Sequence, residues 1–533
     1  MRPRGEAVRM RTVPLLTATA LLAGVACLAP SAGAAGTGPV GSPRSDCRAQ
    51  VAGLDLQTAS FADLEKAMAA GRLTSRQLTS AYLDRIKAYD GPTNAIRALN
   101  RNALADASRL DAERKAGHVR GPLHGLPIVL KDNIGTTDMP TTAGSIALEG
   151  SIPKQDAFLT ARLRKAGAVI LGKTNLSEFA NWVDLSMPNG YSSLGGQVKN
   201  GYSLGDPSGS SSGSGVGESM AFAAGAFGSE TSGSILSPSD VNGLVGVKPT
   251  RGLVSRAGVI PLAEGFDTAG PMTRSVADAA ALLTAVAGTD ARDAATANAA
   301  QHATDYVKAI RGASLKGVRL GYSASAFSGG STGQQKVFAR VLADLQRLGA
   351  TLVDTDVVED GGNAGLAELG LIPNDFKANL NHYLTTEIAT PKSGVKSLAD
   401  IIAFNSKHPD KVKYGQKLLQ ASDATPGEAN TASAGSLALR TTMGALIDGA
   451  LAKDSLDAIL ATGASYANAG ASAGYPTVIV PAGLVNDKAA TGVSFMGTAW
   501  SEAKLLRLAA AYEAGTHRRV PPTVVNEDLL THC

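Results

Sequence analysis

The sequence contains few cysteines and few aromatic residues, and it lacks the usual marks of a metal enzyme. Only three of its 533 residues are cysteine, two are tryptophan, and aromatic residues make up 5%. It contains no H-E-x-x-H pair and no clustered Cys/His pairs, so it predicts no metal site. Its most conspicuous glycine clusters contain no lysine, which a phosphate-binding loop would need. We therefore expect an enzyme or binding protein that uses no cofactor.

The chain also lacks a strong excess of charge of either sign. Its formal net charge is +4, and its content of 44% hydrophobic and 18% charged residues is typical of a globular protein. Removal of residues 1–34, which is expected below, takes away four arginines and one glutamate and lowers the net charge to +1. A nearly neutral protein has no field that attracts nucleic acid or an anionic membrane, so we expect neither as a partner.

The N-terminal residues have the pattern of a secretory signal. Four arginines precede an apolar stretch from about Leu15 to Leu28, and the small residues A-G-A follow at 32–34. A membrane-spanning helix needs about 20 apolar residues, and this stretch is shorter. The pattern predicts a signal peptide over 1–34, a secreted protein, and a disordered lead-in over 35–50.

The three cysteines lead to two separate expectations. Cys27 lies within the predicted signal and would anchor a lipoprotein, but Gly24 stands where such a signal has a larger aliphatic residue. Only Cys47 and Cys533 remain after cleavage, one near each end of the chain. Because a secreted protein meets an oxidising environment, we expect these two cysteines to form a disulfide.

Two Gly/Ser clusters dominate the middle of the chain. They read S-G-S-S-S-G-S-G-V-G at 208–217 and G-S-E-T-S-G-S-I-L-S at 228–237. Met220, Ala223 and Phe227 between them fall at helical spacing, which predicts a short helix joining two tight turns. A flexible linker is the alternative, but linkers do not usually enclose an apolar periodic segment. The arrangement would bring hydroxyl groups from the two clusters close together.

Helical patterns and short apolar runs alternate over the rest of the chain. Residues 75–89 and 103–115 predict helices, and S-E-F-A-N-W at 177–182 predicts the start of another. Buried strands are predicted at 126–130, 168–171, 317–322, 457–460, 477–480 and 493–496. This alternation indicates an α/β fold with a mixed sheet covered by helices on both faces. Residues 356–450 are mostly helical in pattern, and we expect them to cover the site.

These blocks together resemble the amidase signature family. The resemblance rests on G-S-S-S-G-S, then G-x-E-T-x-G-S, then N-G-x-V-G-x-K-P-T-x-G-L-V-S-R in and after the two clusters. Further matching blocks lie at 121–133, 172–182, 267–280, 473–483 and 501–513. Length alone favours two or more domains. The resemblance instead implies one large α/β domain over 51–533 and an enzyme that hydrolyses amides.

The resemblance also implies a Ser–cis-Ser–Lys triad. By motif position, Lys131 is the base, Ser210 the bridging serine and Ser234 the nucleophile. A lysine at the end of an apolar strand can become a base, because loss of water lowers its pKa from about 10.4 towards neutrality. The backbone of Thr231, Ser232 and Gly233 is expected to form the oxyanion hole.

Several alternatives remain open within this interpretation. His124 is the nearest candidate for a histidine base, although a structural role in its turn is favoured. The register of the first cluster could be wrong by one, because Ser211 and Ser212 follow Ser210. Ser232 stands where the family usually has Gly or Asp, and Asp240 has no explanation from the sequence.

The expected substrate is a small amide. The motifs most resemble peptide amidases, which remove C-terminal amide groups from peptides. A hydrolase of cyclic amides or aryl-acylamides is the alternative, and a secreted binding protein without catalysis is a third possibility. The resemblance to the glutamyl-tRNA amidotransferase enzymes is weaker. The oligomeric state is not predicted.

Overall fold

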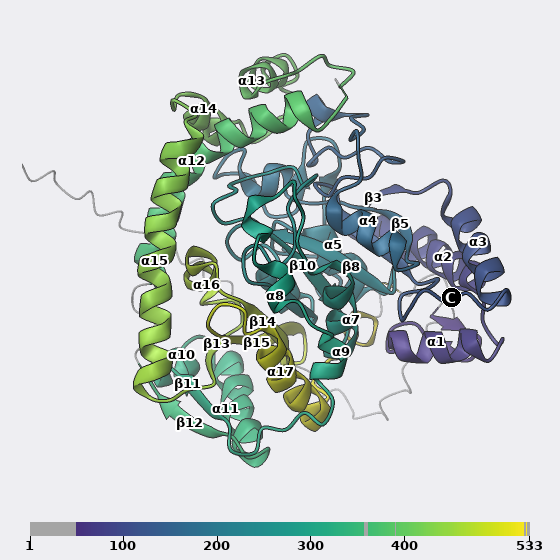
Figure 1. Ribbon diagram of the computed structural model, residues 1–533, viewed down its shortest axis with the longest axis vertical. Helices are drawn as coiled ribbons and strands as arrows, with labels where there is room; N and C mark the ends of the chain where they lie inside the picture. The colour runs from purple at the N-terminus through teal and green to yellow at the C-terminus, as the bar shows by residue number, and fades with distance from the viewer. Residues whose placement is uncertain (1–48, 356–360, 390, 527–528, 530–533) are drawn as a thin grey trace, which may run out of the picture. The chain divides into compact units, whose positions relative to one another are not determined.

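The computed structural model describes residues 49–355, 361–389, 391–526 and 529, without the side chains of 361–369 and 430–432. These residues form one compact unit (Figure 1). The predicted signal, nearly all of the lead-in, and both Cys47 and Cys533 lie outside the described residues. Those predictions therefore stay untested.

A mixed sheet of 11 strands forms the centre of the unit. In sheet order the strands are β12 (Thr351–Asp354), β11 (Arg319–Tyr322), β13 (Ala458–Thr462), β15 (Ala489–Met496), β14 (Thr477–Val485), β9 (Val245–Lys248), β10 (Thr268–Thr273), β8 (Gly225–Glu230), β4 (Pro127–Lys131), β5 (Val169–Thr174) and β3 (Ile96–Leu99). Strand β4 runs parallel to β5 and β8, and β11 runs parallel to β12 and β13, whereas the other pairs are antiparallel. The six predicted strands are confirmed as β4, β5, β11, β13, β14 and β15.

Helices cover both faces of this sheet. Along β14, Val478 and Val480 pack into the largest hydrophobic cluster, which includes Leu505 of α17 (Glu502–Thr516). Ile479, between them, packs with Leu236 of α6 (Leu236–Val241). Because successive side chains of a strand point to opposite faces, α17 and α6 lie on opposite sides of the sheet. The predicted fold class is confirmed.

The remaining elements surround the sheet. The helices before the second Gly/Ser cluster are α1 (Phe61–Ala69), α2 (Ser75–Thr93), α3 (Ala103–Lys115), α4 (Phe158–Lys165) and α5 (Ser212–Ser219). Those after it are α7 (Val276–Val286), α8 (Ala299–His302), α9 (Tyr306–Ala309), α10 (Ala324–Ser328), α11 (Thr332–Arg347), α16 (Ala467–Ala473) and α18 (Pro522–Val525). Short 3-10 helices are η1 (Ile146–Leu148), η2 (Glu178–Asn181) and η3 (Ala294–Thr296). Two small sheets pair β1 (Gln50–Val51) with β2 (Leu54–Asp55) and β6 (Tyr191–Ser192) with β7 (Gly196–Gln197).

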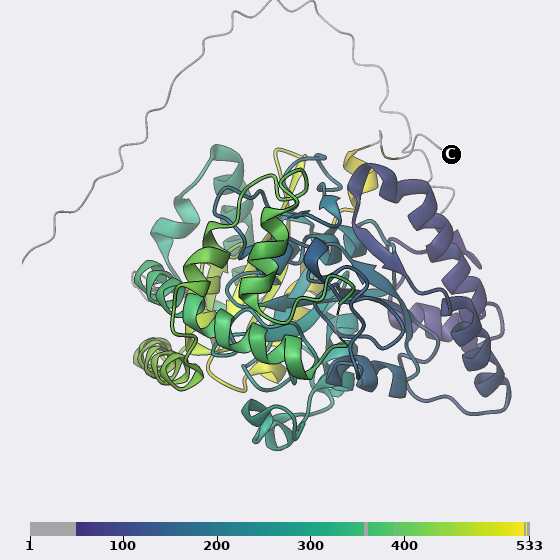
Figure 2. The ribbon, with the colours of Figure 1, turned by 90° about the horizontal axis from the view of Figure 1, so that it is seen from above.

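The predicted helical segment forms a layer of its own. It contains α12 (Gly361–Thr386), α13 (Leu398–Ser406), α14 (Lys417–Asp423) and α15 (Ala429–Lys453). Helices α12 and α15 lie side by side in Figure 1, and α13 and α14 lie at their upper end. A second hydrophobic cluster joins Phe376 and Leu380 of α12 to Phe179, Leu262 and Phe266 (Figure 2 gives the view from above). The segment therefore packs directly on loops that border the site described below.

The predicted helix between the two Gly/Ser clusters is wrong. Helix α5 begins inside the first cluster, at Ser212, and Gly225–Glu230 is the buried strand β8 between β10 and β4. Glycine is needed in this strand because the chain packs closely: a Cβ on Gly228 would lie 2.8 Å from Ser211 Oγ. Met220 and Phe227 are both buried, but Met220 caps the end of α5 and Phe227 lies in β8. Their helical spacing therefore does not belong to one helix.

Two further patterns have a different meaning in the structure. The helix expected to begin at 177–182 is only η2, which is interrupted by left-handed backbone at Phe179 and Ala180 (φ 45° and 58°). Residues 167–174 match the letters G-x-x-x-x-G-K-T of a phosphate-binding loop. Residues 169–174 form β5, however, and Lys173 is buried with its Nζ 3.4 Å from Asp132 Oδ1. A strand interior has no free N–H groups to surround a phosphate.

Candidate active site

Lys131 ends strand β4 with its side chain fully buried. Its Nζ lies 2.8 Å from Ser210 Oγ, 3.0 Å from Ser229 Oγ and 3.2 Å from the Ser229 carbonyl oxygen. Burial lowers the pKa of Lys131 from 10.5 to about 7, and the negative charges of Asp267 and Glu230 oppose part of this shift. A lysine in this state exchanges a proton near neutral pH.

Ser210 lies at the start of the first Gly/Ser cluster, where the Gly209–Ser210 peptide bond is cis. The neighbouring serines are engaged elsewhere: Ser211 Oγ donates to the Ser229 carbonyl oxygen over 3.0 Å, and Ser212 Oγ donates to the Ser208 carbonyl oxygen over 2.5 Å. The letters G-x-S-x-G at 209–213 centre on Ser211, but this serine is fully buried rather than exposed on an elbow. Ser210 is thus the serine of this cluster that contacts Lys131.

Ser234 lies just before α6 and is 6% exposed. Its carbonyl oxygen accepts a hydrogen bond from the Ser211 N–H over 3.2 Å, which joins the two Gly/Ser clusters. The buried carboxylate of Glu230 accepts from the N–H groups of Ile235 (2.7 Å) and Leu236 (3.0 Å). A carboxylate is favourable at this position because the first N–H groups of a helix have no partner within the helix.

The three residues expected to form the oxyanion hole lie in the turn between β8 and Ser234. Thr231 Oγ1 donates to Asp267 Oδ1 over 2.5 Å, and Ser232 Oγ donates to Asn468 Oδ1 over 2.7 Å. Gly233 has a φ of 81°, a conformation that side chains other than glycine rarely adopt. The turn is therefore fixed by side-chain contacts on both sides and by glycine at its tightest point.

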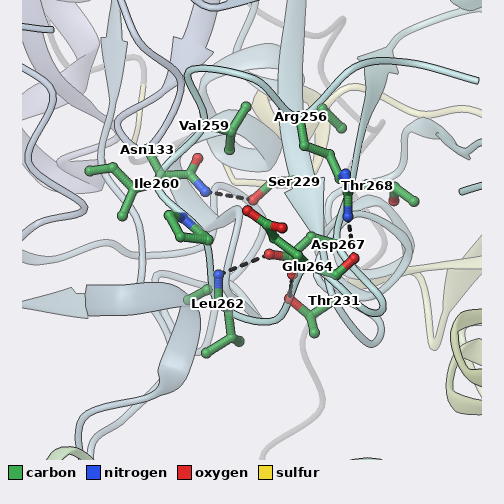
Figure 3. Close-up of a pocket in the computed structure, with 13 residues that line it drawn as sticks. Asn133, Ser229, Thr231, Arg256, Val259, Ile260, Leu262, Glu264, Asp267 and Thr268 are labelled. Atoms are coloured by element: carbon green, nitrogen blue, oxygen red, sulfur yellow. Dashed lines mark hydrogen bonds between the residues drawn. The ribbon is translucent and has the colours of Figure 1, made fainter. Parts of the chain in front are cut away.

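A cavity opens beside this turn (Figure 3). Its volume is about 390 Å³, including the part open to solvent. The lining residues are Asn133, Ala180, Ser229, Thr231, Arg256, Val259, Ile260, Pro261, Leu262, Glu264, Asp267, Thr268 and Ala269. Its polar groups include the hydroxyl of Ser229. Ser229 Oγ accepts a hydrogen bond from Lys131 Nζ and another from Asn133 Nδ2 over 2.8 Å. Apolar side chains from 259–262 supply another part of the wall.

The sequence interpretation missed several residues of this site. Ser229 and Glu230 were part of the motif G-S-E-T, and Asn133 was part of L-K-D-N, but none received a role. Asp267 opens the block D-T-A-G-P. Asn468 lies in an alanine-rich stretch without any motif, so nothing in the sequence pointed to it.

Two residues that the sequence left open have structural partners. His124 is 1% exposed, its Nδ1 accepts from the Arg120 N–H and its Nε2 lies 2.9 Å from the Leu110 carbonyl oxygen, so it fixes a turn away from the serines. Burial lowers the pKa of His124. Asp240 accepts from the Gly492 N–H over 2.6 Å and therefore links α6 to β15.

The described residues contain neither a membrane-spanning helix nor a metal cluster. No helix in that part of the chain is long and apolar enough to cross a bilayer. No group of three or more His, Cys, Asp or Glu side chains in the same ranges is arranged to hold a metal ion.

The comparisons with known proteins show the family of this chain. The family model described as "Amidase" matches residues 77–465, and the chain belongs to this family. It is 38% identical over 485 residues to a probable amidase of Arabidopsis thaliana, covering 88% of this chain and 92% of the relative. It is 37% identical over 476 residues to a putative amidase of Arthroderma benhamiae, covering 83% of this chain and 79% of the relative.

A solved structure gives a nearer likeness. The native peptide amidase of Stenotrophomonas maltophilia is 44% identical, with a TM-score of 0.82, over 87% of this chain and 98% of that chain. The chain is therefore an amidase by family and an enzyme that hydrolyses amides.

Proposed function

We propose that this chain is a secreted amidase that hydrolyses C-terminal amides of peptides, or related small amides, with Ser234 as nucleophile. The observation that carries the proposal is the buried contact of 2.8 Å between Lys131 Nζ and Ser210 Oγ, beside the turn that holds Ser234. A neutral lysine in that position can accept a proton that a serine delivers.

In the proposed first step, Ser234 Oγ attacks the carbonyl carbon of the amide. The Ser234 proton passes to Ser210 Oγ, and the Ser210 proton passes to Lys131 Nζ. The carbonyl oxygen becomes an oxyanion, and the backbone N–H groups of the turn from Thr231 to Gly233 stabilise it.

The second step breaks the C–N bond. Ser210 gives its proton to the leaving nitrogen and regains one from Lys131, so ammonia or an amine departs and an ester on Ser234 remains. Water then attacks this ester and gives its proton to Ser210, whose own proton passes to Lys131. When the carboxylic acid leaves, the same two residues return a proton to Ser234.

Two observations support a peptide-like substrate. The likeness to the peptide amidase reaches 44% identity over nearly the whole of both chains. The cavity offers an apolar wall at Val259, Ile260 and Leu262 next to polar groups at Ser229 and Thr231, which suits an apolar acyl part that ends in an amide. A cyclic-amide or aryl-acylamide hydrolase is the second candidate, because the same lining would hold an aromatic ring.

The secretion part of the proposal rests on the sequence alone. The arginines, the apolar stretch from Leu15 to Leu28 and A-G-A at 32–34 form the expected order of a signal. Expression with the native N-terminus should deliver protein to the medium that begins near residue 35. Recovery of only cell-associated protein that retains residues 1–34 would contradict it.

A substrate panel tests the proposed activity. The protein without residues 1–34 is incubated with a peptide amide, the same peptide as free acid, an aryl-acylamide and a cyclic amide, and ammonia or amine release is measured. We expect release from the peptide amide and none from the Ser234→Ala variant. Preferred turnover of the ring-containing amides would support the second candidate. Binding of peptide amides without any turnover would support a non-catalytic binding protein.

A further inference from the structure

Asp267 precedes strand β10, and its carboxylate fixes two loops at once. Its Oδ1 accepts from Thr231 Oγ1 over 2.5 Å, and its Oδ2 accepts from the N–H groups of Leu262 and Ala263, each over 2.9 Å. Figure 3 shows the carboxylate between Thr231 on one side and Leu262 on the other. The aspartate thus joins the turn that carries the nucleophile to the loop that lines the cavity.

The loop held by Asp267 is fixed at several other points. The carbonyl oxygen of Glu264 accepts from Arg251 Nη2 over 2.8 Å, and the carbonyl oxygen of Gly265 accepts from Arg440 Nη1 over 2.6 Å. The Gly265 N–H donates to Asp375 Oδ2 over 3.0 Å. Asp375 of α12 and Arg440 of α15 therefore fix the loop that precedes Asp267.

The charges around Asp267 come from several elements. The negative charges of Asp267 and of Glu230 in β8 both raise the pKa of Lys131 in β4. Burial, the largest cause, raises the pKa of Asp267 to about 6, while Arg256 lowers it and Asp375 raises it further. Arg256 is ion-paired to Asp293 over 2.5 Å, and Glu230 holds the start of α6. Asp375 holds the Gly265 N–H.

We propose that Asp267 is a positioning residue for amide hydrolysis, whose carboxylate fixes the nucleophile turn through Thr231 and the cavity loop through Leu262 and Ala263. The proposal rests on the triad of the proposed function. The hydrogen bond from Thr231 to Asp267 fixes the turn, and with it the backbone N–H groups that would donate to the oxyanion. The negative charge stabilises protonated Lys131 and so delays its deprotonation as the pH rises.

The charge can be removed while the hydrogen bonds are kept. In Asp267→Asn, the amide oxygen can accept from Leu262 and Ala263, and the amide nitrogen can donate to Thr231 Oγ1, since a hydroxyl both donates and accepts. Loss of the negative charge lowers the pKa of Lys131, so the acidic limb of kcat/KM should move about one unit to lower pH. A purely structural role would leave the limb where it is.

Asp375→Asn provides the matched control. It removes a carboxylate that holds the same loop but does not contact the nucleophile turn. Its acidic limb should coincide with that of the wild type. A shift of equal size in both variants would show a general change in charge and would overturn the specific role of Asp267.

Thr231 tests the positioning half separately. Thr231→Val keeps the shape and removes the hydroxyl, and we expect kcat to fall about tenfold with little change in KM, because the loss concerns the transition state. Thr231→Ser keeps the hydroxyl and should restore kcat to within about twofold of the wild type. Equal kcat values for the Val and Ser variants would overturn the positioning role. This test stays valid if Asp267→Asn does not fold, because it does not use that variant.

The outcomes also separate this inference from the proposed function. A wild-type protein that releases no ammonia from any amide in the panel refutes the proposed function. An active wild type whose acidic limb is unchanged in Asp267→Asn refutes only the charge role of Asp267. Circular dichroism and the melting temperature of each variant test whether it is folded.

Discussion

The N–H group of Ser211 donates to the carbonyl oxygen of Ser234 over 3.2 Å, so the two Gly/Ser clusters meet through their backbones. This contact brings residues 23 positions apart in the sequence together at the end of strand β4, where Lys131 stands. Ser210 of the first cluster and Ser229 of the second both contact this buried lysine. Activity is expected to depend on that arrangement.

The first prediction concerns the three triad candidates. Ser234→Ala should abolish turnover and covalent labelling by a fluorophosphonate, a loss of at least about 10³-fold. Ser210→Ala and Lys131→Ala should each lower kcat by about 10²–10⁴-fold because they remove proton transfer. Ser212→Ala is the matched control, since its hydroxyl donates to the Ser208 carbonyl oxygen rather than to Lys131. Substantial activity in Ser234→Ala would mean that another residue is the nucleophile.

The second prediction concerns pH. The pKa of Lys131 is lowered to about 7, and only the neutral amine can accept a proton. Amidase activity should therefore be low below pH 7, where the lysine is protonated, and rise through an apparent pKa near 7. The rate is measured from about pH 5 to 10 on a peptide amide, a range that spans this titration. A limb that disappears in His124→Ala while Lys131→Ala stays active would refute the lysine as base.

The third prediction concerns the buried ion pair between Arg274 and Glu218. Arg274 Nη1 lies 2.7 Å from Glu218 Oε1, and the two side chains are 4% and 0% exposed. Glu218→Ala leaves a buried guanidinium without its carboxylate, so we expect a loss of about 3–5 kcal/mol in the free energy of unfolding. Chemical denaturation provides the measurement. Lys504→Ala is the control, because its pair with Asp457 is largely exposed (53% and 37%) and should contribute at most about 1 kcal/mol.

The fourth prediction concerns Ser232, which departs from the family pattern. Its hydroxyl donates to Asn468 of α16 over 2.7 Å at the edge of the nucleophile turn. Because the expected oxyanion donors are backbone groups, Ser232→Gly should keep kcat within about threefold and alter KM more than kcat. Steady-state kinetics on two peptide amides of different size would reveal this difference. A collapse of kcat would show that the side chain supports the turn itself.

The fifth prediction concerns Cys47 and Cys533, which lie outside the described residues. A disulfide between them would close nearly the whole chain into one loop, and we expect a stabilisation of about 5 kcal/mol as an upper value. Ellman titration of the unfolded, unreduced protein should find no free thiol after signal removal. Two free thiols would refute the disulfide.

The sequence by itself predicted much of the secondary structure and the candidate triad. Helix α2 begins after a capping box of Thr74 and Gln77, and strand β4 is a continuous apolar run, so both can be recognised from neighbouring residues. Family motifs assigned Lys131, Ser210 and Ser234, and the structure brings Lys131 and Ser210 into contact. Their catalytic roles stay predictions.

Tertiary structure alone decided the rest. Strand β8 reads G-A-F-G-S-E and has no strand pattern of its own, and it is a strand because β10 and β4 pair with it on either side. Thr231 meets Asp267 at a separation of 36 residues, and Ser232 meets Asn468 at a separation of 236. Periodicity reports which side of an element is buried, but it carries no information about which distant element supplies a hydrogen-bond partner. That choice depends on the order and register of the strands, which only the folded sheet defines.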